Sequence, residues 1–287
     1  MPLTVTVGVD GSPQSLAAVD WAAREAELRG LPLRVVNAWQ MPYPLPEAPE
    51  AREALEHWAR RVPRETGERV RRAHPSLELT VEQTDGRAGE VLSAAAEGSA
   101  LLVLGSEGLS GMAGYLVGSI GHLLLGEVAG TPLVFVRSAG SGGREPVPDG
   151  PVVVGVSDGA DAPLGFAFEA ADRRGCPVRA VHAWRVPGYF GYGLVSDDSL
   201  TSGHDQREAA RLADLVRPWR ERYPAVPVHE ETVAGRAVDA LTDASDGGAL
   251  LVVGHRTRRL PVGARAGSIT YGALHHVPIP VAVVSYR

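Results

Sequence analysis

The sequence predicts an α/β protein made of two tandem copies of an open, mostly parallel five-stranded sheet with helices on both faces, a Rossmann-like architecture. In each half, short β-branched runs alternate with longer segments of helical periodicity, which is the order of a doubly wound sheet with right-handed crossovers. Apolar runs such as ALLVLGS are continuous, as expected of parallel strands buried on both faces. The third observation is that the same series of motifs occurs twice along the 287 residues.

The duplication defines two domains joined by a linker. Paired motifs follow in the same order at nearly constant separations, and the clearest pairs are VTVGVDG at 5–11 with VVVGVSDG at 152–159, ALLVLGSEG at 100–108 with ALLVVGHRT at 249–257, and TPLVFV at 131–136 with IPVAVV at 279–284. Between the copies, SAGSGGREPVPDG is rich in Gly, Ser and Pro and has no periodicity. We therefore expect a first domain at 1–137, a linker at 138–150 and a second domain at 151–287.

The first copy predicts strands and helices in strict alternation. Apolar and β-branched runs predict strands at 4–9, 33–39, 77–83, 100–106 and 132–137. Segments of helical periodicity predict helices at 12–29, 50–72, 88–97 and 115–127. Pro63 falls inside the second of these helices and is expected to break or kink it. Such sheets bind ligands beyond the carboxyl ends of the strands, at the point where the strand order reverses.

Composition argues against several classes of function. The formal net charge is −6 and the chain has no lysine, so it carries neither a basic block for nucleic acid nor the lysine of a P-loop. No apolar stretch approaches the roughly 20 residues that cross a bilayer, and the amino terminus lacks the pattern of a secretory signal. Cys176 is the single cysteine, which excludes an internal disulfide and a cysteine-based zinc site. These features predict a cytoplasmic protein without a nucleic-acid or membrane partner.

The stretch GSEGLSGMAGYLVGS, which begins at Gly105, carries the strongest functional signal. Gly105 and Gly108 permit positive φ and let backbone N–H groups approach a ligand. Gly118 and Ser119 lie near the start of the next helix, where free N–H groups and the helix dipole favour an anion. The loop is therefore suited to a phosphate chain, although the same glycines also fit a plain turn between a strand and a helix.

Asp10 follows the first strand on the same rim of the sheet. A carboxylate there either accepts hydrogen bonds from a ribose hydroxyl or a base amino group, or caps the helix that starts near Ser12. On chemistry alone the two roles are equally well supported.

The spacing G-x2-G-x9-G-[ST] of this loop resembles the nucleotide-binding signature of the universal stress protein family. VGVDGS at the first strand and AGTPLVFVR at the last strand also resemble that family, and the likeness covers both halves of the chain. The resemblance implies that this sheet binds ATP or another adenine nucleotide on its carboxyl-terminal rim. Because the loop carries no basic residue, we expect Mg²⁺ to neutralise the phosphates. The ligands implied by the family motif are the side chain of Asp10, the backbone of Ala38, Gly105, Gly108, Gly118, Ser119 and the backbone of Ile120. It also implies pairing through the last strand, here between the two domains as an intramolecular pseudo-dimer, with a homodimer as a further option.

The second copy departs from this pattern. Ser157 stands after the first strand in the place of Asp10, and Asp158 could take that place only if the backbone shifts by one position. Thr257 replaces the second glycine of the loop, where a β-branched residue disfavours positive φ. The other residues of this degenerate second site are Gly254, Gly267, Ser268 and Ile269. We therefore expect nucleotide binding mainly in the first domain.

The sequence contains no nucleophile with a matched base and no metal-ligand spacing, so we expect a protein that is not an enzyme and whose ATP hydrolysis, if any, is slow. The expected function is a stress-response regulatory protein whose nucleotide occupancy modulates binding to a protein partner that the sequence does not name. One alternative is a nucleotide-independent dimeric scaffold, favoured by the altered second site and by Glu107 in the glycine loop. The other is a nucleotide-using enzyme of similar architecture.

Overall fold

The structure, a computed structural model, describes residues 3–40, 48–106, 119–184, 198–256 and 267–286. The described residues form two compact units that divide between Arg144 and Glu145, which lies inside the segment expected to be the linker. These units are called domain 1 and domain 2. Each is built around a parallel sheet with helices on both faces.

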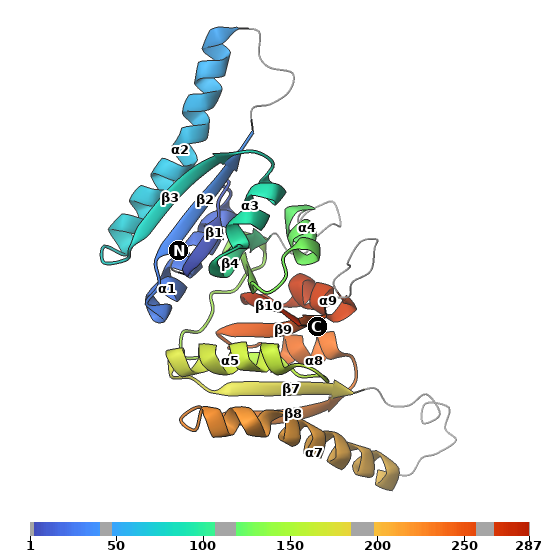
Figure 1. Cartoon of the computed structure of the whole chain (residues 1–287). Helices are drawn as coiled ribbons and strands as arrows, with labels where there is room; N and C mark the ends of the chain where they lie inside the picture. Colours follow the sequence, from blue (N-terminus) through green and yellow to red (C-terminus); the bar gives the residue numbers. More distant parts are fainter. Residues whose placement is uncertain (1–2, 41–47, 107–118, 185–197, 257–266, 287) are drawn as a thin grey trace. The chain divides into compact units, whose positions relative to one another are not determined.

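Domain 1 alternates strands and helices along the chain (Figure 1). Its elements are β1 (Thr4–Gly8), α1 (Pro13–Arg29), β2 (Leu33–Trp39), α2 (Pro49–Ala73), β3 (Leu79–Asp85), α3 (Ala88–Ala96), β4 (Ser99–Ser106), α4 (Ser119–Glu127) and β5 (Leu133–Arg137). The strands are parallel in the order β3-β2-β1-β4-β5. The chain builds outward from β1 to β3 and then places β4 on the other side of β1. The strand order therefore reverses between β1 and β4, where the carboxyl ends leave room for a ligand.

Helix α1 shows why the sequence forms these elements. It begins after Ser12, whose hydroxyl accepts a hydrogen bond of 3.2 Å from the N–H of Ser15, and it ends at Gly30, which has a φ of 62°. Small apolar residues on one face, such as Ala18 and Ala22, are fully buried and let the helix lie close to β1, β4 and β5. Helices α1 and α2 pack on one face of the sheet, while α3 and α4 pack together on the other.

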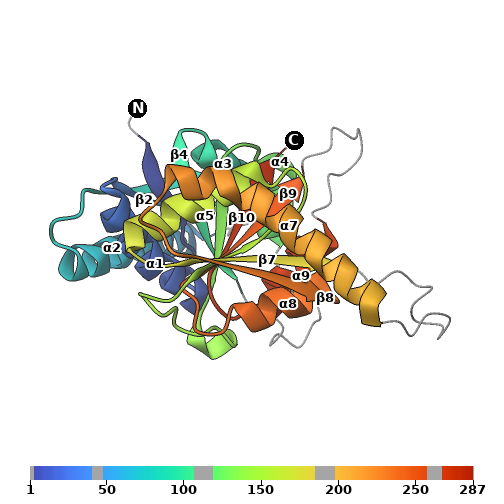
Figure 2. The ribbon, with the colours of Figure 1, turned by 90° about the horizontal axis from the view of Figure 1, so that it is seen from below.

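Domain 2 repeats this plan. Its elements are β6 (Val152–Gly155), α5 (Asp161–Arg174), β7 (Val178–Trp184), α7 (Asp198–Arg222), β8 (Val228–Ala234), α8 (Ala237–Ala244), β9 (Leu250–Arg256), α9 (Ser268–His276) and β10 (Val281–Tyr286). The strands are parallel in the order β8-β7-β6-β9-β10. Helices α5 and α7 cover one face, and α8 and α9 the other (Figure 2).

The thiol of Cys176 is buried, and burial raises its pKa.

The predicted fold class is confirmed, and the boundaries that the structure describes in domain 1 agree with the expected ones to within two residues. The break considered at Pro63 does not occur: α2 runs on through this residue, which is buried. The lost backbone hydrogen bond is outweighed by burial of the face that includes Val70.

The expected linker also contains a short 3₁₀ turn, η2 (Ala139–Ser141). Residues 115–118 of the expected fourth helix lie outside the described residues. Among the described residues, no helix is long and apolar enough to span a bilayer.

Candidate functional site

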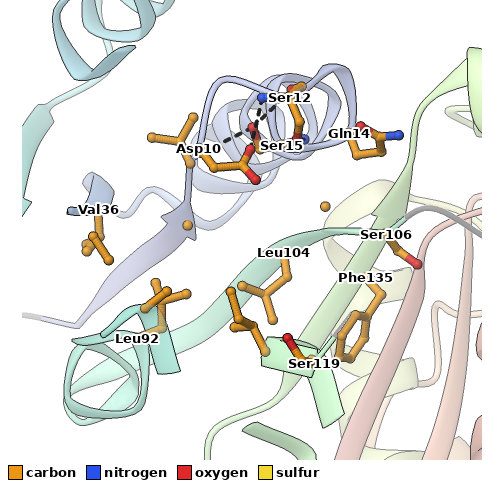
Figure 3. A pocket seen from close by; sticks show the side chains of 17 residues that line it. Asp10, Ser12, Gln14, Ser15, Val36, Leu92, Leu104, Ser106, Ser119 and Phe135 are labelled. Atoms are coloured by element: carbon orange, nitrogen blue, oxygen red, sulfur yellow. Dashed lines mark hydrogen bonds between the residues drawn. The ribbon is translucent and has the colours of Figure 1, made fainter. Parts of the chain in front are cut away.

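A pocket of about 250 Å³ opens at the carboxyl ends of β1 and β4, where the strand order of domain 1 reverses (Figure 3). Its walls come from the ends of β1, β2 and β4, the start of α1, helix α3, the start of α4, and Phe135 of β5. Pockets that hold small molecules usually measure roughly 300–1,000 Å³. The described walls therefore enclose a space close to the lower end of that range.

Most of the residues predicted for the nucleotide site meet in this pocket. Those that line it are Asp10 after β1, Ala38 in β2, Gly105 in β4, and Ser119 and Ile120 at the start of α4. Gly108 and Gly118 lie outside the described residues, as does Glu107. The structure thus brings together four separate segments of the chain, while the role of these residues toward a ligand stays a prediction.

Asp10 is the one charged residue among the described residues that line the pocket. Its Oδ1 accepts a hydrogen bond of 2.9 Å from the N–H of Ser12, and its own N–H donates to the hydroxyl of Ser15 at 3.3 Å. Partial burial raises the pKa of Asp10, but hydrogen bonds from Ser12 and Ser15 outweigh this effect, and the pKa lies below its ordinary value of 3.8. The cap of α1 is Ser12, so Asp10 supports the turn before the helix and presents an ionised, exposed carboxylate at the rim.

Asn37, which sequence reasoning did not select, fixes the end of β1. It is 6% exposed, and its Nδ2 donates a hydrogen bond of 2.7 Å to the carbonyl of Val9. Its Oδ1 accepts a hydrogen bond of 3.0 Å from Nε2 of Gln83. Because Val9 directly precedes Asp10, Asn37 positions the backbone that carries the carboxylate. The available signal was a polar residue inside the apolar strand run LRVVNAW.

Glycine is needed at position 105 because of a close contact, and not because of the positive φ that we expected. The described glycines with positive φ do not include Gly105. A Cβ on this residue would lie 2.6 Å from the backbone C of Gln14 and the N of Ser15, which is closer than side chains tolerate. The start of α1 therefore rests directly on the end of β4 and closes one wall of the pocket.

The remaining walls combine apolar surface with neutral hydrogen-bonding groups. Leu92, Leu104 and Phe135 supply apolar surface, and Ser106 and Ser119 supply hydroxyls (Figure 3). No arginine or histidine is present among the described lining residues. In the described part of the chain, no group of three or more His, Cys, Asp or Glu side chains is placed to bind a metal. Such a pocket suits a flat apolar group together with an anionic group held by N–H and hydroxyl donors.

In domain 2 the backbone shifts by one position, so that Asp158, and not Ser157, is the structural counterpart of Asp10. The glycine after Asp10 has a φ of 84° and the glycine after Asp158 has a φ of 76°, so the extra residue of this loop is Ser157. Arg211 of α7 forms a two-point ion pair with the carboxylate of Asp158. This carboxylate is therefore already engaged by a cation of its own domain.

The other residues predicted for a second site are placed at similar positions. Gly254 lies near the end of β9, Gly267 is the cap of α9, and Ser268 and Ile269 open that helix, whereas Thr257 lies outside the described residues. The space beside Gly254 is filled, because Cε1 of Tyr286 lies 2.7 Å from where a Cβ of Gly254 would be. The guanidinium of Arg256 stands 5.7 Å from the centre of the Tyr286 ring. The ring of Tyr286, together with Pro163 in the first turn of α5, thus fills the space beside Gly254, as the start of α1 fills the space beside Gly105.

Known proteins resemble the chain over nearly its whole length. The sequence profile of the universal stress protein family matches residues 1–137 and 150–285. Universal stress protein Rv1996 of Mycobacterium tuberculosis H37Rv is 30% identical over 304 residues, which cover 98% of this chain and 94% of that protein. Universal stress protein Rv2005c of the same strain is 32% identical over 297 residues, which cover 97% and 96%.

Solved structures share the fold. The crystal structure of a universal stress protein from Archaeoglobus fulgidus DSM 4304 matches with a TM-score of 0.69 at 15% identity, covering 98% of this chain and 97% of that one. At this identity the likeness bears on the fold alone. Because the family profile matches both domains and the relatives cover nearly all of the sequence, the chain belongs to the universal stress protein family, as a tandem two-domain member.

Proposed function

We propose that domain 1 binds ATP or another adenine nucleotide in the pocket at the ends of β1 and β4. The protein would then be a stress-response regulator, not an enzyme, whose nucleotide occupancy controls its binding to a protein partner. The single observation that carries the proposal is the pocket itself. The family motif implies nucleotide ligands in four separate segments of the chain. Those ligands that the structure describes line one cavity.

The lining suits the three parts of a nucleotide. Leu92 and Leu104 offer apolar surface to a base, and the ionised carboxylate of Asp10 is an acceptor for ribose hydroxyls. Ser119 and Ile120 belong to the first turn of α4, where free N–H groups and the helix dipole favour phosphate. Mg²⁺ carried by the phosphates would supply the positive charge that the described lining lacks.

Ile120 connects the pocket with the surface of domain 1. It lines the pocket and is still 39% exposed, and Leu123, one turn further along α4, is 41% exposed. A nucleotide that contacts the start of α4 would favour one position of this helix over others. Occupancy would thereby change how these apolar side chains are presented to a protein partner.

Calorimetric titration with ATP, with and without Mg²⁺, tests the proposal on protein freed of nucleotide. We expect one binding event per chain, which Ser119→Trp abolishes because an indole at this exposed helix start blocks the pocket. Ser268→Trp is the matched control, since Ser268 is the first residue of α9 in domain 2 as Ser119 is of α4. The control should bind like the wild type. No heat from the wild-type protein, together with no co-purified nucleotide by mass spectrometry, would refute nucleotide binding.

A nucleotide-independent dimeric scaffold is the second candidate. It is favoured by domain 2, where Arg211 engages the carboxylate of Asp158, the counterpart of Asp10. Pairing of the last strands, within one chain or between two, would be its working contact. The calorimetric titration separates the candidates, because a nucleotide-independent scaffold takes up no ATP.

A further inference from the structure

Ser106, the last residue of β4, carries a buried hydroxyl that has no hydrogen-bond partner among the described residues. The residue is 5% exposed and lines the pocket of domain 1. Burying a hydroxyl without a partner costs free energy, and native proteins leave few such groups. An unsatisfied hydroxyl in a pocket wall therefore points to a ligand that satisfies it.

Ser99, at the opposite end of the same strand, is a buried serine whose hydroxyl does have hydrogen-bond partners. It is 7% exposed, its Oγ donates a hydrogen bond of 2.6 Å to the carbonyl of Ala95, and it lies 2.7 Å from the hydroxyl of Thr6. The two serines share strand and burial but differ in partners. The difference coincides with the pocket, because Ser106 lines it and Ser99 does not.

The side chain of Ser106 lies on the same face of the sheet as the start of α4. The Cβ direction of Gly105 points at α1, and successive side chains of a strand alternate between faces, so Ser106 faces the side covered by α3 and α4. Ser119 and Ile120 open α4 and line the same pocket. In Figure 3, the side chain of Phe135 lies between Ser106 and Ser119. An anion at the start of α4 would share the pocket with an unused donor.

We infer that the Ser106 hydroxyl donates a hydrogen bond to a phosphate oxygen of the bound nucleotide and makes the pocket prefer nucleotides to nucleosides. This inference rests on the proposed function of domain 1. The described lining holds no arginine, and the chain has no lysine, so the described groups that can donate to the phosphates are neutral, beside any Mg²⁺ that the nucleotide carries. A hydrogen bond to a charged oxygen is stronger than one between neutral groups. Ser106 is then a specificity-determining residue of the site.

Two substitutions at the two ends of β4 test the inference. For the wild type, Ser106→Ala and Ser99→Ala, calorimetry measures the Kd for ATP and for adenosine, and a thermal scan measures the unfolding temperature without ligand. We expect Ser106→Ala to weaken ATP binding about ten- to a hundredfold, as for loss of a hydrogen bond to a charged group. Its adenosine Kd should change less than about twofold, and its unfolding temperature should equal or exceed that of the wild type, because an unsatisfied hydroxyl is removed.

Ser99→Ala should show the reverse pattern, a lower unfolding temperature with an unchanged Kd for ATP, because its hydroxyl has partners and is remote from the pocket. A wild-type Kd for ATP in Ser106→Ala would overturn the inference while leaving nucleotide binding by domain 1 intact. Equal weakening of ATP and adenosine, or a lower unfolding temperature without ligand, would make Ser106 a structural residue and overturn it as well. Failure of the wild-type protein to bind either compound would instead refute the proposed function.

Discussion

Gly105→Ala tests the closest contact in the wall of the pocket. A Cβ at this position would lie 2.6 Å from the backbone C of Gln14 and the N of Ser15, whereas ordinary contacts begin at 3.4 Å. The start of α1 and the end of β4 would have to separate by about 0.8 Å, the difference between these distances. Overpacking usually costs about 1–3 kcal/mol. Because the obstacle is backbone and not the end of a flexible side chain, we expect about 2–3 kcal/mol.

Hydrogen exchange measured by mass spectrometry in increasing urea is the suitable assay, because peptides from β1, α1 and β4 report the free energy of unfolding of domain 1 separately from domain 2. In a thermal scan the same loss would lower the unfolding temperature of domain 1 by roughly 4–12 °C. Gly140→Ala is the control, since a Cβ there meets nothing within 4 Å and the residue has no positive φ. The control should stay within about 0.5 kcal/mol of the wild type.

Gly105→Ala should also weaken ATP binding, because moving the start of α1 displaces the groups of Ser12 and Ser15 that hold Asp10. A Gly105→Ala protein as stable as the control would contradict this prediction. Such a result would mean that β4 and α1 do not meet at the distance described, and that the glycine serves only the loop that follows.

Three further experiments examine the rim of each sheet. The pKa of Asp10 lies below its ordinary value of 3.8, so its hydrogen bonds stabilise domain 1 above that value and are lost as the pH falls through the lowered pKa. Urea titrations from about pH 3 to 7 should therefore show a smaller acid-induced loss of stability in Asp10→Asn than in the wild type. Asn37→Ala leaves the carbonyl of Val9 without its buried donor and should reduce the free energy of unfolding by about 1–3 kcal/mol in urea, while an unchanged value would show that another group replaces the amide. Since Arg211 already pairs with Asp158, the counterpart of Asp10, calorimetry should find one ATP per wild-type chain, and a stoichiometry of two would show that a nucleotide displaces this ion pair.

The fold was predictable because its signals are local and repeated. Ser12 before an apolar periodic segment and Gly30 after it mark α1, and a β-branched run marks β2. Pro63 led to a wrong expectation because helix propensity is a local quantity, whereas α2 is held by burial of one face on the sheet, which only the folded chain reveals.

The lining of the pocket was predictable where a sequence motif exists and not where the reason is a contact between distant segments. Asp10 belongs to the motif VGVDGS and Gly105 to the glycine spacing, and both line the pocket. The physical reason for Gly105 was expected to be positive φ and is instead its approach to α1, which has no local signature in the sequence. The missing partner of Ser106 is likewise visible only in three dimensions, since every neighbouring donor and acceptor must be known before a hydroxyl is counted as unsatisfied.

The two domains share one contact that shapes the rim. In domain 1 the amide of Asn37 donates to the carbonyl of Val9 at the end of β1. At the equivalent position of domain 2, Nδ1 of His182 lies 2.9 Å from the carbonyl of Val156 at the end of β6. Both domains therefore tie the second strand to the end of the first with a side chain, although the residue types differ. The frame of the rim is common to both domains, so differences in binding have to arise from the groups beyond it.

Those groups differ in one respect that matters for a ligand. In domain 2, Nε2 of His182 lies 3.1 Å from Oε2 of Glu208, and Glu208 lies 3.7 Å from Arg211. Arg211 in turn forms an ion pair with Asp158. The polar groups of this rim therefore satisfy one another. A ligand that binds Asp158 would have to displace Arg211, and breaking this ion pair would reduce the binding free energy. Asp10 takes part in no ion pair among the described residues and is fixed by neutral hydrogen bonds from the turn before α1. Its carboxylate is therefore available without such a competition, which is the physical reason for expecting the nucleotide in domain 1.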